Sequence, residues 1–370
     1  MDNLDINIFS FFAGAGFLDL GFEKSGYDIK LVNEYLPAFM NAYQYSRKHM
    51  KLGEPEFGYQ TNDINVFLGD QKKEMADYIT ISKKEALTGF IGGPPCPDFS
   101  IAGKNKGKDG DNGKLSLSYI QSIITFNPDF FLFENVKGLW KTARHRAFFE
   151  DLKNILHNAG YCTTERLTNS LEFGAPQDRD RILLFGLKRK YLKSKNLDNN
   201  KILNFPWESK MVYSMDEIQK CNWPTENTFK NEGQLAQPKN IITELTVEHW
   251  FKKNDVLKHL NGNDFFKPKA GLAKMKVINE GDVSKKCFKR LHRWRYSPTA
   301  AYGNNEVHLH PYKERRLTVA ETLAIQSLPK EFVLPPEMTL TDKFKTVGNG
   351  VPYLMGKGIA ETILEFLEEI

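Results

Sequence analysis

Short apolar runs alternate with amphipathic stretches through the first half of the chain. Runs typical of strands buried on both faces cover residues 6–12, 29–33, 87–91, 130–133 and 181–187. Apolar side chains at helical spacing occur in residues 17–25, 36–48 and 117–126. This alternation predicts an α/β fold with a parallel, doubly wound sheet, in which ligands bind at the carboxyl ends of the strands.

The pattern changes after residue 188. Lysine and asparagine dominate up to residue 201, and tryptophans are then scattered through a stretch without clear periodicity. Helical spacing returns at 317–328 and at 351–370. We therefore predict a sheet domain over 1–189, a separate module over 190–315 and a segment over 316–370 that returns to the sheet domain.

Composition places the chain among ordinary globular proteins. Of its 370 residues, 41% are hydrophobic and 26% are charged. No apolar stretch approaches the roughly 18 residues that a membrane span requires, and the first residues do not resemble a secretory signal. The four cysteines are widely spaced without a CxxC pair, which argues against a disulfide framework or a zinc site and favours a reducing cytoplasm.

Basic residues concentrate in one part of the second half. The net charge is only +5, but residues 285–316 contain nine Lys or Arg against two Glu. The aromatic residues Trp294, Tyr296, Tyr302 and Tyr312 are interleaved with them. This combination suits contacts with nucleic-acid phosphates and groove edges, whereas the alternative is a solvated surface strip. Charge alone leaves both interpretations open.

A glycine-containing turn follows the first predicted strand. Its sequence, Phe12-Ala13-Gly14-Ala15-Gly16, lets the backbone turn tightly and approach a ligand closely. Glu34 ends the second predicted strand, where a carboxylate can accept hydrogen bonds from ribose hydroxyls. Asp63 and Ile64 come next, as candidates to bind an adenine amino group and to pack its ring. The pattern favours an adenosine-containing cofactor, and a turn required only for packing is the alternative.

A second turn presents a single thiol. Gly92-Gly93-Pro94-Pro95 follows a predicted strand and leads directly to Cys96. A cysteine held in such a turn near a cation can act as a nucleophile, but a lone cysteine is more often a packed core residue.

Two further segments favour the interpretation of Cys96 as a nucleophile over that of a packed core residue. Glu134 directly follows the strand predicted at 130–133, and Gln177-Asp178-Arg179-Asp180-Arg181 directly precedes another strand. Separate surface roles do not explain a thiol, a carboxylate and two guanidinium groups gathered at one sheet edge beside an adenosine site.

These motifs, in this order, resemble those of the cytosine-C5 DNA methyltransferase family over nearly the whole chain. The matching segments are residues 12–16, 33–35, 62–64, 95–96, 134–136, 177–181, 316–329 and 348–352. The resemblance implies a Rossmann-like α/β sheet over 1–189 that uses S-adenosylmethionine, with 190–315 as a smaller target-recognition domain. It also implies a monomer of the bacterial restriction-modification or Dcm-like type, with double-stranded DNA as substrate and a cognate restriction endonuclease as an expected partner.

The resemblance assigns a role to each catalytic motif. The Cys96 thiolate adds to carbon 6 of a cytosine flipped out of the duplex, which activates carbon 5. Glu134 protonates ring nitrogen 3 and Arg181 holds the carbonyl oxygen of the base. Arg179 acts in the same pocket or on a neighbouring phosphate. The loop over 97–115 is expected to close over the base.

The resemblance also implies the binding residues. Cofactor contacts are expected from Phe12, Gly14, Ala15, Gly16, Glu34, Tyr35, Asp63, Ile64, Gly93, Pro95, Leu115, Asn349 and Val351. DNA contacts are expected from Ser100, Arg293, Arg295 and Thr299. No metal is expected, and His308 and His310 are interpreted as part of a solvated loop.

Two segments depart from the family pattern. The residue after the nucleophile is commonly Gln, but here Pro97 follows Cys96, and residues 111–116 read Asp-Asn-Gly-Lys-Leu-Ser where the family has Asp-x-Arg-Gly-x-Leu-Phe. Three alternatives remain. They are the tRNA-directed branch of the family, whose Cys-Phe-Thr signature is absent; a non-catalytic DNA-binding relative, which would have lost Cys96 or Glu134; and a dinucleotide oxidoreductase, which the Gln-x-Arg-x-Arg motif disfavours.

Overall fold

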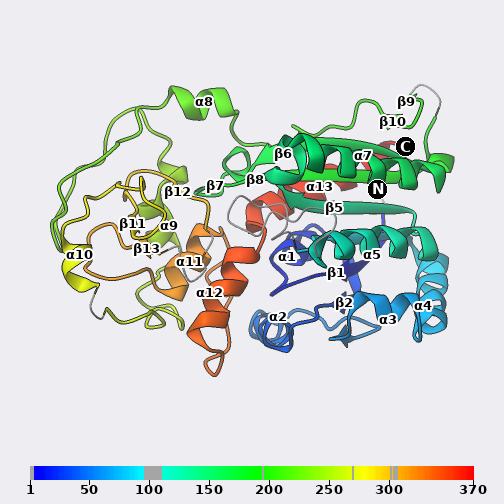
Figure 1. The fold of residues 1–370 in the computed structure, drawn as a ribbon, viewed down its shortest axis with the longest axis horizontal. Helices are drawn as coiled ribbons and strands as arrows, with labels where there is room; N and C mark the ends of the chain where they lie inside the picture. Colours follow the sequence, from blue (N-terminus) through cyan, green and yellow to red (C-terminus); the bar gives the residue numbers. More distant parts are fainter. Residues whose placement is uncertain (1–3, 96–110, 194–195, 269–270, 301, 303–306) are drawn as a thin grey trace.

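A computed structural model of the chain describes residues 4–95, 111–193, 196–268, 271–300, 302 and 307–370. Its main sheet contains β1 (Ile6–Phe11), β2 (Asp28–Asn33), β3 (Tyr59–Gln60), β4 (Leu87–Gly92), β5 (Phe130–Val136), β6 (Tyr161–Asn169), β8 (Asp180–Lys188), β9 (Leu197–Asp198) and β10 (Lys201–Ile202). The strand order in this nine-stranded sheet is β3-β2-β1-β4-β5-β8-β6-β10-β9. A smaller module lies beside the sheet (Figure 1).

One central strand runs against its neighbours. The strands β3, β2, β1, β4 and β5 are mutually parallel, as the sequence predicts, whereas β8 pairs antiparallel with both β5 and β6. Arg181, near the start of β8, is paired with Val136 at the end of β5. The reversal therefore brings the start of β8 to the edge where the parallel strands end.

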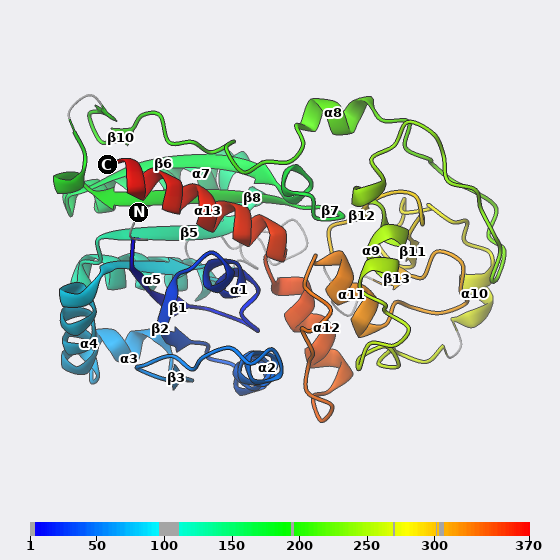
Figure 2. The same ribbon diagram turned by 180° about the vertical axis from the view of Figure 1, so that it is seen from behind.

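Helical layers cover both faces of the sheet, as Figures 1 and 2 show from opposite sides. One layer contains α3 (Ile64–Leu68), α4 (Lys72–Glu85), α5 (Asp111–Phe126), α6 (Lys137–Lys141) and α7 (Ala143–Asn158). The other contains α1 (Phe17–Lys24), α2 (Pro37–His49) and α13 (Tyr353–Glu369). Along β5, Phe130 and Leu132 pack towards α13, and the alternate residues Phe131 and Phe133 pack towards α5 and α7.

Glycines in the sheet lie under aromatic rings of the neighbouring strand. Gly89 of β4 is paired with Phe130 of β5, and Gly186 of β8 is paired with Phe131. A Cβ atom built at Gly89 would lie 2.2 Å from Phe130 Cζ, and one built at Gly186 would lie 2.1 Å from Phe131 Cε1. The rings thus occupy the volume that a larger residue would need, one on each face of β5.

Loops and short elements form the module. It contains α8 (Met215–Lys220), α9 (Val247–Lys253), α10 (Leu272–Lys276), β11 (Lys289–Arg290), β12 (Ser297–Pro298) and β13 (His308–Leu309). The strand β12 pairs in parallel with β7 (Gln177–Asp178), which lies just before β8. The chain then returns to the sheet through α11 (Val319–Ile325), α12 (Leu340–Asn349) and α13. The module is therefore joined to the edge of the sheet at which the parallel strands end.

The structure differs from the sequence prediction in several elements. The prediction omitted α4, α7, α12 and β6, whose polar positions interrupt the apolar pattern. The sheet also continues past residue 189, because β10 pairs with β6 and β9 pairs with β10. His308 and His310 do not lie in a solvated loop, since each is only 2% exposed. That interpretation was wrong because it judged the two residues without their apolar neighbours.

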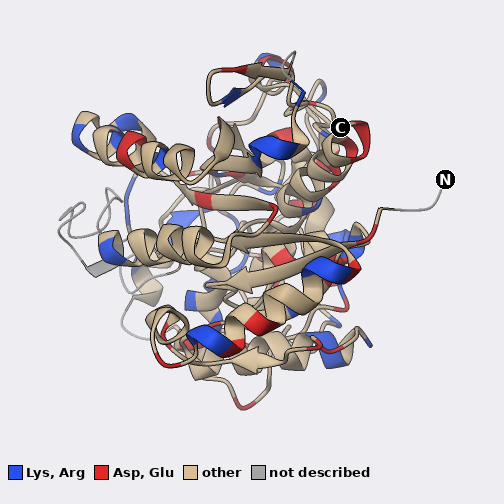
Figure 3. Cartoon of the chain, turned by 90° about the vertical axis from the view of Figure 1, so that its right-hand side faces the viewer, with Lys and Arg blue, Asp and Glu red and all other residues tan. Residues whose placement is uncertain are grey.

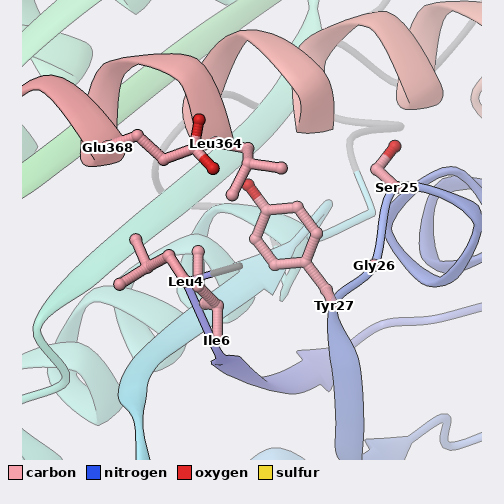
Figure 4. A pocket seen from close by; sticks show the side chains of 7 residues that line it. All are labelled: Leu4, Ile6, Ser25, Gly26, Tyr27, Leu364 and Glu368. Atoms are coloured by element: carbon pink, nitrogen blue, oxygen red, sulfur yellow. The ribbon is translucent and has the colours of Figure 1, made fainter. Parts of the chain in front are cut away.

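A small cavity of about 30 Å³ lies where β1 meets α13 (Figure 4). Ile6 lines it from β1, Leu4 from the residues just before β1, and Leu364 and Glu368 from α13. Tyr27 donates from its hydroxyl to the carbonyl oxygen of Ala360 (2.8 Å), and burial raises the pKa of this tyrosine. No residue of the predicted site lines this cavity, and its contacts hold α13 against the sheet.

Candidate active site at the carboxyl edge of the sheet

Glu134 and Arg181 meet at the carboxyl edge of the parallel strands. Glu134 lies near the end of β5 and Arg181 near the start of β8, so the antiparallel pairing places them side by side. The Nε of Arg181 lies 2.6 Å from Oε1 of Glu134. The two residues are only 9% and 8% exposed. A charge-assisted bond so largely removed from water holds both side chains in one orientation.

The second carboxylate oxygen of Glu134 faces the turn that leads to Cys96. A Cβ atom built at Gly93 would lie 2.6 Å from Oε2 of Glu134, so only glycine lets the backbone pass the carboxylate this closely. Asn135 donates from its side-chain amide to the carbonyl oxygen of Pro94 (3.4 Å). Residues 134 and 135 thus hold the first half of the turn. The predicted nucleophile Cys96, like Ser100, lies outside the described residues.

Arg179 makes contacts other than those predicted for it. It is 2% exposed, and its guanidinium donates to the carbonyl oxygens of Ala300 (3.0 Å) and Gly348 (2.9 Å). Burial, together with the charge of Arg181, holds the pKa of Arg179 well below its ordinary value. This geometry opposes the predicted contact with the base or a phosphate. Arg179 instead joins the end of the module to the predicted cofactor segment at 348–351.

Two glutamines extend this junction. Gln177 accepts from the backbone amide of Ala300 (2.9 Å) and donates to the side-chain oxygen of Gln326 (3.1 Å). Gln326, just after α11, donates to the carbonyl oxygens of Val347 (2.5 Å) and Gly350 (3.4 Å). We call Gln177, Arg179 and Gln326 the polar hub. The sequence prediction missed Gln326, and the available signal was a glutamine inside the largely apolar run 323–328.

Glu34 holds the shape of the turn after β1. This turn contains three residues with positive φ, namely Phe12 (55°), Gly14 (58°) and Gly16 (76°). Glu34 accepts from the backbone amides of Gly14 (2.9 Å) and Leu36 (2.8 Å). Burial raises the pKa of Glu34, against the lowering effect of these two bonds. Each oxygen keeps a second lone pair, so the carboxylate fits the predicted contact with ribose hydroxyls.

The next predicted cofactor residues lie on neighbouring loops of the same edge. Asp63 caps α3 by accepting from the backbone amide of Asn65 (2.8 Å), and Ile64 beside it is buried. Tyr35 follows Glu34 and is 63% exposed, which leaves an aromatic face open to a ligand. A carboxylate, a capped helix start and an open ring fit a ligand that carries both a sugar and a base.

The last predicted cofactor segment passes over the first turn. Asn349 at the end of α12 is exposed, whereas Val351 is buried. A Cβ atom built at Gly350 would lie 2.1 Å from Cδ2 of Phe17, the first residue of α1. The described cofactor candidates that complete this edge are Ala15, which is buried; Phe12, Gly93 and Leu115, which are half-buried; and Pro95, which is exposed.

The predicted DNA contacts divide into one buried and two accessible side chains. Arg293 is 7% exposed, and its Nε and Nη2 each lie 2.8 Å from a carboxylate oxygen of Glu280. This ion pair stabilises the module itself and corrects the predicted role of Arg293. Arg295 and Thr299 are half-buried, and Thr299 donates to the carbonyl oxygen of Asp178 (2.6 Å) next to the β7–β12 pair.

The opposite edge of the sheet carries charges of both signs, as Figure 3 shows from the end remote from the module. Lys30 on this edge lies within 3.5 Å of carboxylate oxygens of Asp28, Glu56 and Glu85. Such mixed charge does not create the positive field that attracts nucleic acid. In the part of the chain that the structure describes, no helix is long and apolar enough to cross a membrane, and no three His, Cys, Asp or Glu residues form a group that could hold a metal ion.

Comparison with known proteins identifies the family. Residues 6–365 match the family model described as C-5 cytosine-specific DNA methylase. The chain is 53% identical to the Type II methyltransferase M.NmeDI of Neisseria meningitidis serogroup C, over 99% of this chain and 87% of that protein. It is 27% identical to M.MthTI of Methanothermobacter thermautotrophicus, over 99% of each. The Dnmt2 methyltransferase of S. pombe has a similar fold, with a TM-score of 0.59 and 14% identity over 98% of each chain. The chain therefore belongs to the C-5 cytosine-specific DNA methylase family.

Proposed function

We propose that Glu134 and Arg181 form the pocket for the target cytosine, and that Cys96 is the nucleophile that attacks the base bound there. As a C-5 cytosine-specific DNA methylase, the protein transfers a methyl group to carbon 5 of cytosine in DNA. The observation that carries the proposal is the ion pair of 2.6 Å between Glu134 and Arg181, whose free carboxylate oxygen faces Gly93. Only Pro94 and Pro95 separate Gly93 from Cys96.

The residue roles follow from where charge develops on the ring. When Sγ of Cys96 bonds to carbon 6, an electron pair moves onto carbon 5, which becomes nucleophilic. Glu134 holds a proton at ring nitrogen 3, and Arg181 donates to the carbonyl oxygen at carbon 2, so negative charge does not accumulate on the base. After carbon 5 has gained the methyl group, the loss of its proton and the departure of Cys96 restore the double bond.

The adjacent turn provides the methyl donor site. S-adenosylmethionine, when bound, supplies an electrophilic methyl group. Glu34 accepts from the ribose hydroxyls, Asp63 accepts from the adenine amino group, and the exposed ring of Tyr35 packs against the adenine. The positive-φ turn at 12–16 and the segment at 349–351 enclose the remainder of the donor. These assignments rest on the shared sheet edge and on the accessibility of Tyr35.

Target recognition belongs to the module within residues 190–315. The module meets the sheet at the β7–β12 pair, beside the Glu134–Arg181 pocket, so a base flipped from a duplex bound to the module could enter that pocket. Arg295 and Thr299 are the accessible candidates for contacts with DNA. The Type II names of the relatives support a place in a restriction-modification system, in which a cognate endonuclease cuts unmethylated sites.

The test measures transfer of a labelled methyl group from S-adenosylmethionine to cytosine-containing duplex DNA and to tRNA, beside a Cys96→Ser variant. We expect label in DNA with the wild-type protein and none with the variant. Label in tRNA but not in DNA would contradict the assigned substrate. Label transferred by the variant would contradict the covalent mechanism. Bisulfite sequencing of the methylated duplex then identifies the recognition sequence.

A further inference from the structure

A buried polar cluster lies behind the turn at 12–16. It consists of Asp19 and Glu23 on α1 and of Tyr43 and Arg47 on α2. Asp19, Tyr43 and Arg47 are each only 1% exposed. The proposed chemistry uses none of these side chains, yet burying charged groups is costly unless they are paired. We call these four residues the turn cluster.

Within the turn cluster, Arg47 donates to the backbone of the turn. Its Nη1 and Nη2 donate to the carbonyl oxygens of Ala15 (3.1 Å) and Gly16 (2.7 Å). Its Nε and Nη2 also donate to Oε2 of Glu23, at 3.1 and 2.8 Å. A planar guanidinium can serve two carbonyl oxygens and a carboxylate at once, because its five N–H groups form a rigid fork. A lysine ammonium at this position could not reproduce that pattern.

The turn packs directly on the cluster. A Cβ atom built at Gly16 would lie 2.3 Å from Cε2 of Tyr43 and 2.6 Å from Nη1 of Arg47. The Arg47 guanidinium stacks over the Tyr43 ring at 3.9 Å, and the Tyr43 hydroxyl donates to Asp19 (3.0 Å). The turn and the two helices are therefore held together by one set of contacts, with no space for the turn to shift towards α2.

We propose that Arg47 is a positioning residue for the methyl donor. The carbonyl oxygen of Gly16 accepts from Arg47 and also from the backbone amide of Leu20 (3.0 Å), so Arg47 reinforces the orientation that the helix gives this peptide. The C=O and N–H groups of a trans peptide point in opposite directions, so the N–H of Phe17 points away from Arg47, towards the proposed donor side. Phe17 is the first residue of α1, and its N–H has no partner within the helix. The inference rests on the donor site proposed at this turn.

The test compares the affinity of the wild-type protein and of Arg47→Lys for S-adenosylhomocysteine, the product of the donor, by calorimetry. We expect the dissociation constant to rise about tenfold in the variant, which is the loss of a single well-placed interaction. The kcat at saturating donor and the affinity for duplex DNA should change less than about twofold, because the base pocket is not touched.

Arg290→Lys is the matched control. Arg290 is likewise fully buried, and it donates to the carbonyl oxygens of Met275, Ile278, His310 and Lys313 inside the module. We expect this variant to lose a similar amount of stability in a urea titration while its affinity for S-adenosylhomocysteine stays unchanged. Equal loss of affinity in both variants would overturn the inference, and so would an Arg47→Lys protein with wild-type affinity.

A milder variant covers the case in which Arg47→Lys does not fold. Glu23→Gln keeps Arg47 but weakens the contact that orients its guanidinium, so we expect the dissociation constant for S-adenosylhomocysteine to rise about threefold. Unchanged affinity in the folded variant would overturn the positioning role. Failure of the wild-type protein itself to bind S-adenosylhomocysteine would instead overturn the proposed donor site, and the inference with it.

Discussion

The two oxygens of the Glu134 carboxylate have different surroundings. Oε1 accepts from Arg181 at 2.6 Å, whereas Oε2 lies against the backbone of Gly93. Glutamine at this position has nearly the same shape and can still accept a bond from Arg181, but its amide has no carboxylic proton to give. The substitution Glu134→Gln therefore separates the shape of the proposed base pocket from the acid function that we propose for Glu134.

We expect Glu134→Gln to lower kcat by ~10²- to 10⁴-fold, the usual contribution of a general acid. Duplex affinity should change only a few-fold, because the module that we propose to bind DNA is unaffected. Single-turnover methylation and fluorescence anisotropy with a labelled duplex measure the two quantities. The control is Glu208→Gln, which removes a largely exposed partner of Arg166 and should leave kcat unchanged. Activity near the wild-type level in Glu134→Gln would exclude an acid role for Glu134.

Two arginines only two positions apart have different surroundings because a strand begins between them. Arg181 lies within β8, where the antiparallel register places it beside Glu134. Arg179 lies just before β8 starts at Asp180, so the alternation of strand side chains does not direct it to the same side. The sequence motif Gln-x-Arg-x-Arg predicted both residues as catalytic. The spacing alone could not separate them, because the start of the strand was not known.

Lysine substitutions should distinguish the two arginines. Arg179→Lys leaves buried carbonyl oxygens of Ala300 or Gly348 without a donor, and we expect the free energy of unfolding to fall by about 2–4 kcal/mol. Arg181→Lys should instead lower kcat by about 100-fold, with a smaller loss of stability. Urea titration and single-turnover methylation on both variants test this contrast. If Arg179→Lys instead lowered kcat and Arg181→Lys instead lowered stability, Arg179 would belong to the base pocket and Arg181 would have a structural role.

The elements that the sequence predicted best are those buried on both faces. The strands β1, β2, β4, β5 and β8 form nearly continuous apolar runs, so hydrophobic pattern alone located them. An apolar run has no direction, however, and the antiparallel course of β8 could not be predicted. The strand β6 escaped prediction because Glu165 and Arg166 interrupt its apolar pattern. The roles of Cys96 and Ser100 stay predictions.

At the scale of the whole molecule, the module buries histidine side chains, among them His308 and His310. Burial lowers the pKa of His308 and of His310 to about 3. In the described part of the chain, neither ring nitrogen of His308 has a hydrogen-bond partner. The His308 ring packs edge-on against Tyr302 at 5.3 Å. A phenyl ring could therefore replace it without losing a hydrogen bond.

These histidines should make the module sensitive to acid. The pKa of an unfolded histidine is about 6.5, so the unfolded chain takes up protons first as the pH falls. The stability due to a neutral buried ring is complete above pH 6.5 and is lost as the pH falls towards 3. At pH 5, each such ring lowers the free energy of unfolding by about 2 kcal/mol relative to its value well above pH 6.5. We expect the free energy of unfolding to fall steeply between pH 7 and pH 5.

The variant His308→Phe should remove about 2 kcal/mol of this loss between pH 7 and pH 5, the contribution of one ring, with equal or greater stability at pH 7. Urea titrations at pH 7, 6 and 5, followed by tryptophan fluorescence, measure the effect. His49 is exposed on α2, and His49→Phe is the control that should leave the slope unchanged. An unchanged slope in His308→Phe would show that His308 is protonated in the folded protein over this range.

The aromatic rings that lie over glycines link positions that are far apart in the sequence. Gly89 and Phe130 share one volume in the sheet, and Gly350 and Phe17 share another between the two ends of the chain. A side chain added at either glycine collides with the ring, and the loss of either ring leaves a cavity, so each single change is destabilising. As related proteins diverge, the members of each pair should change together or not at all. Covariation between these distant positions in related sequences would therefore reflect the packing of the sheet.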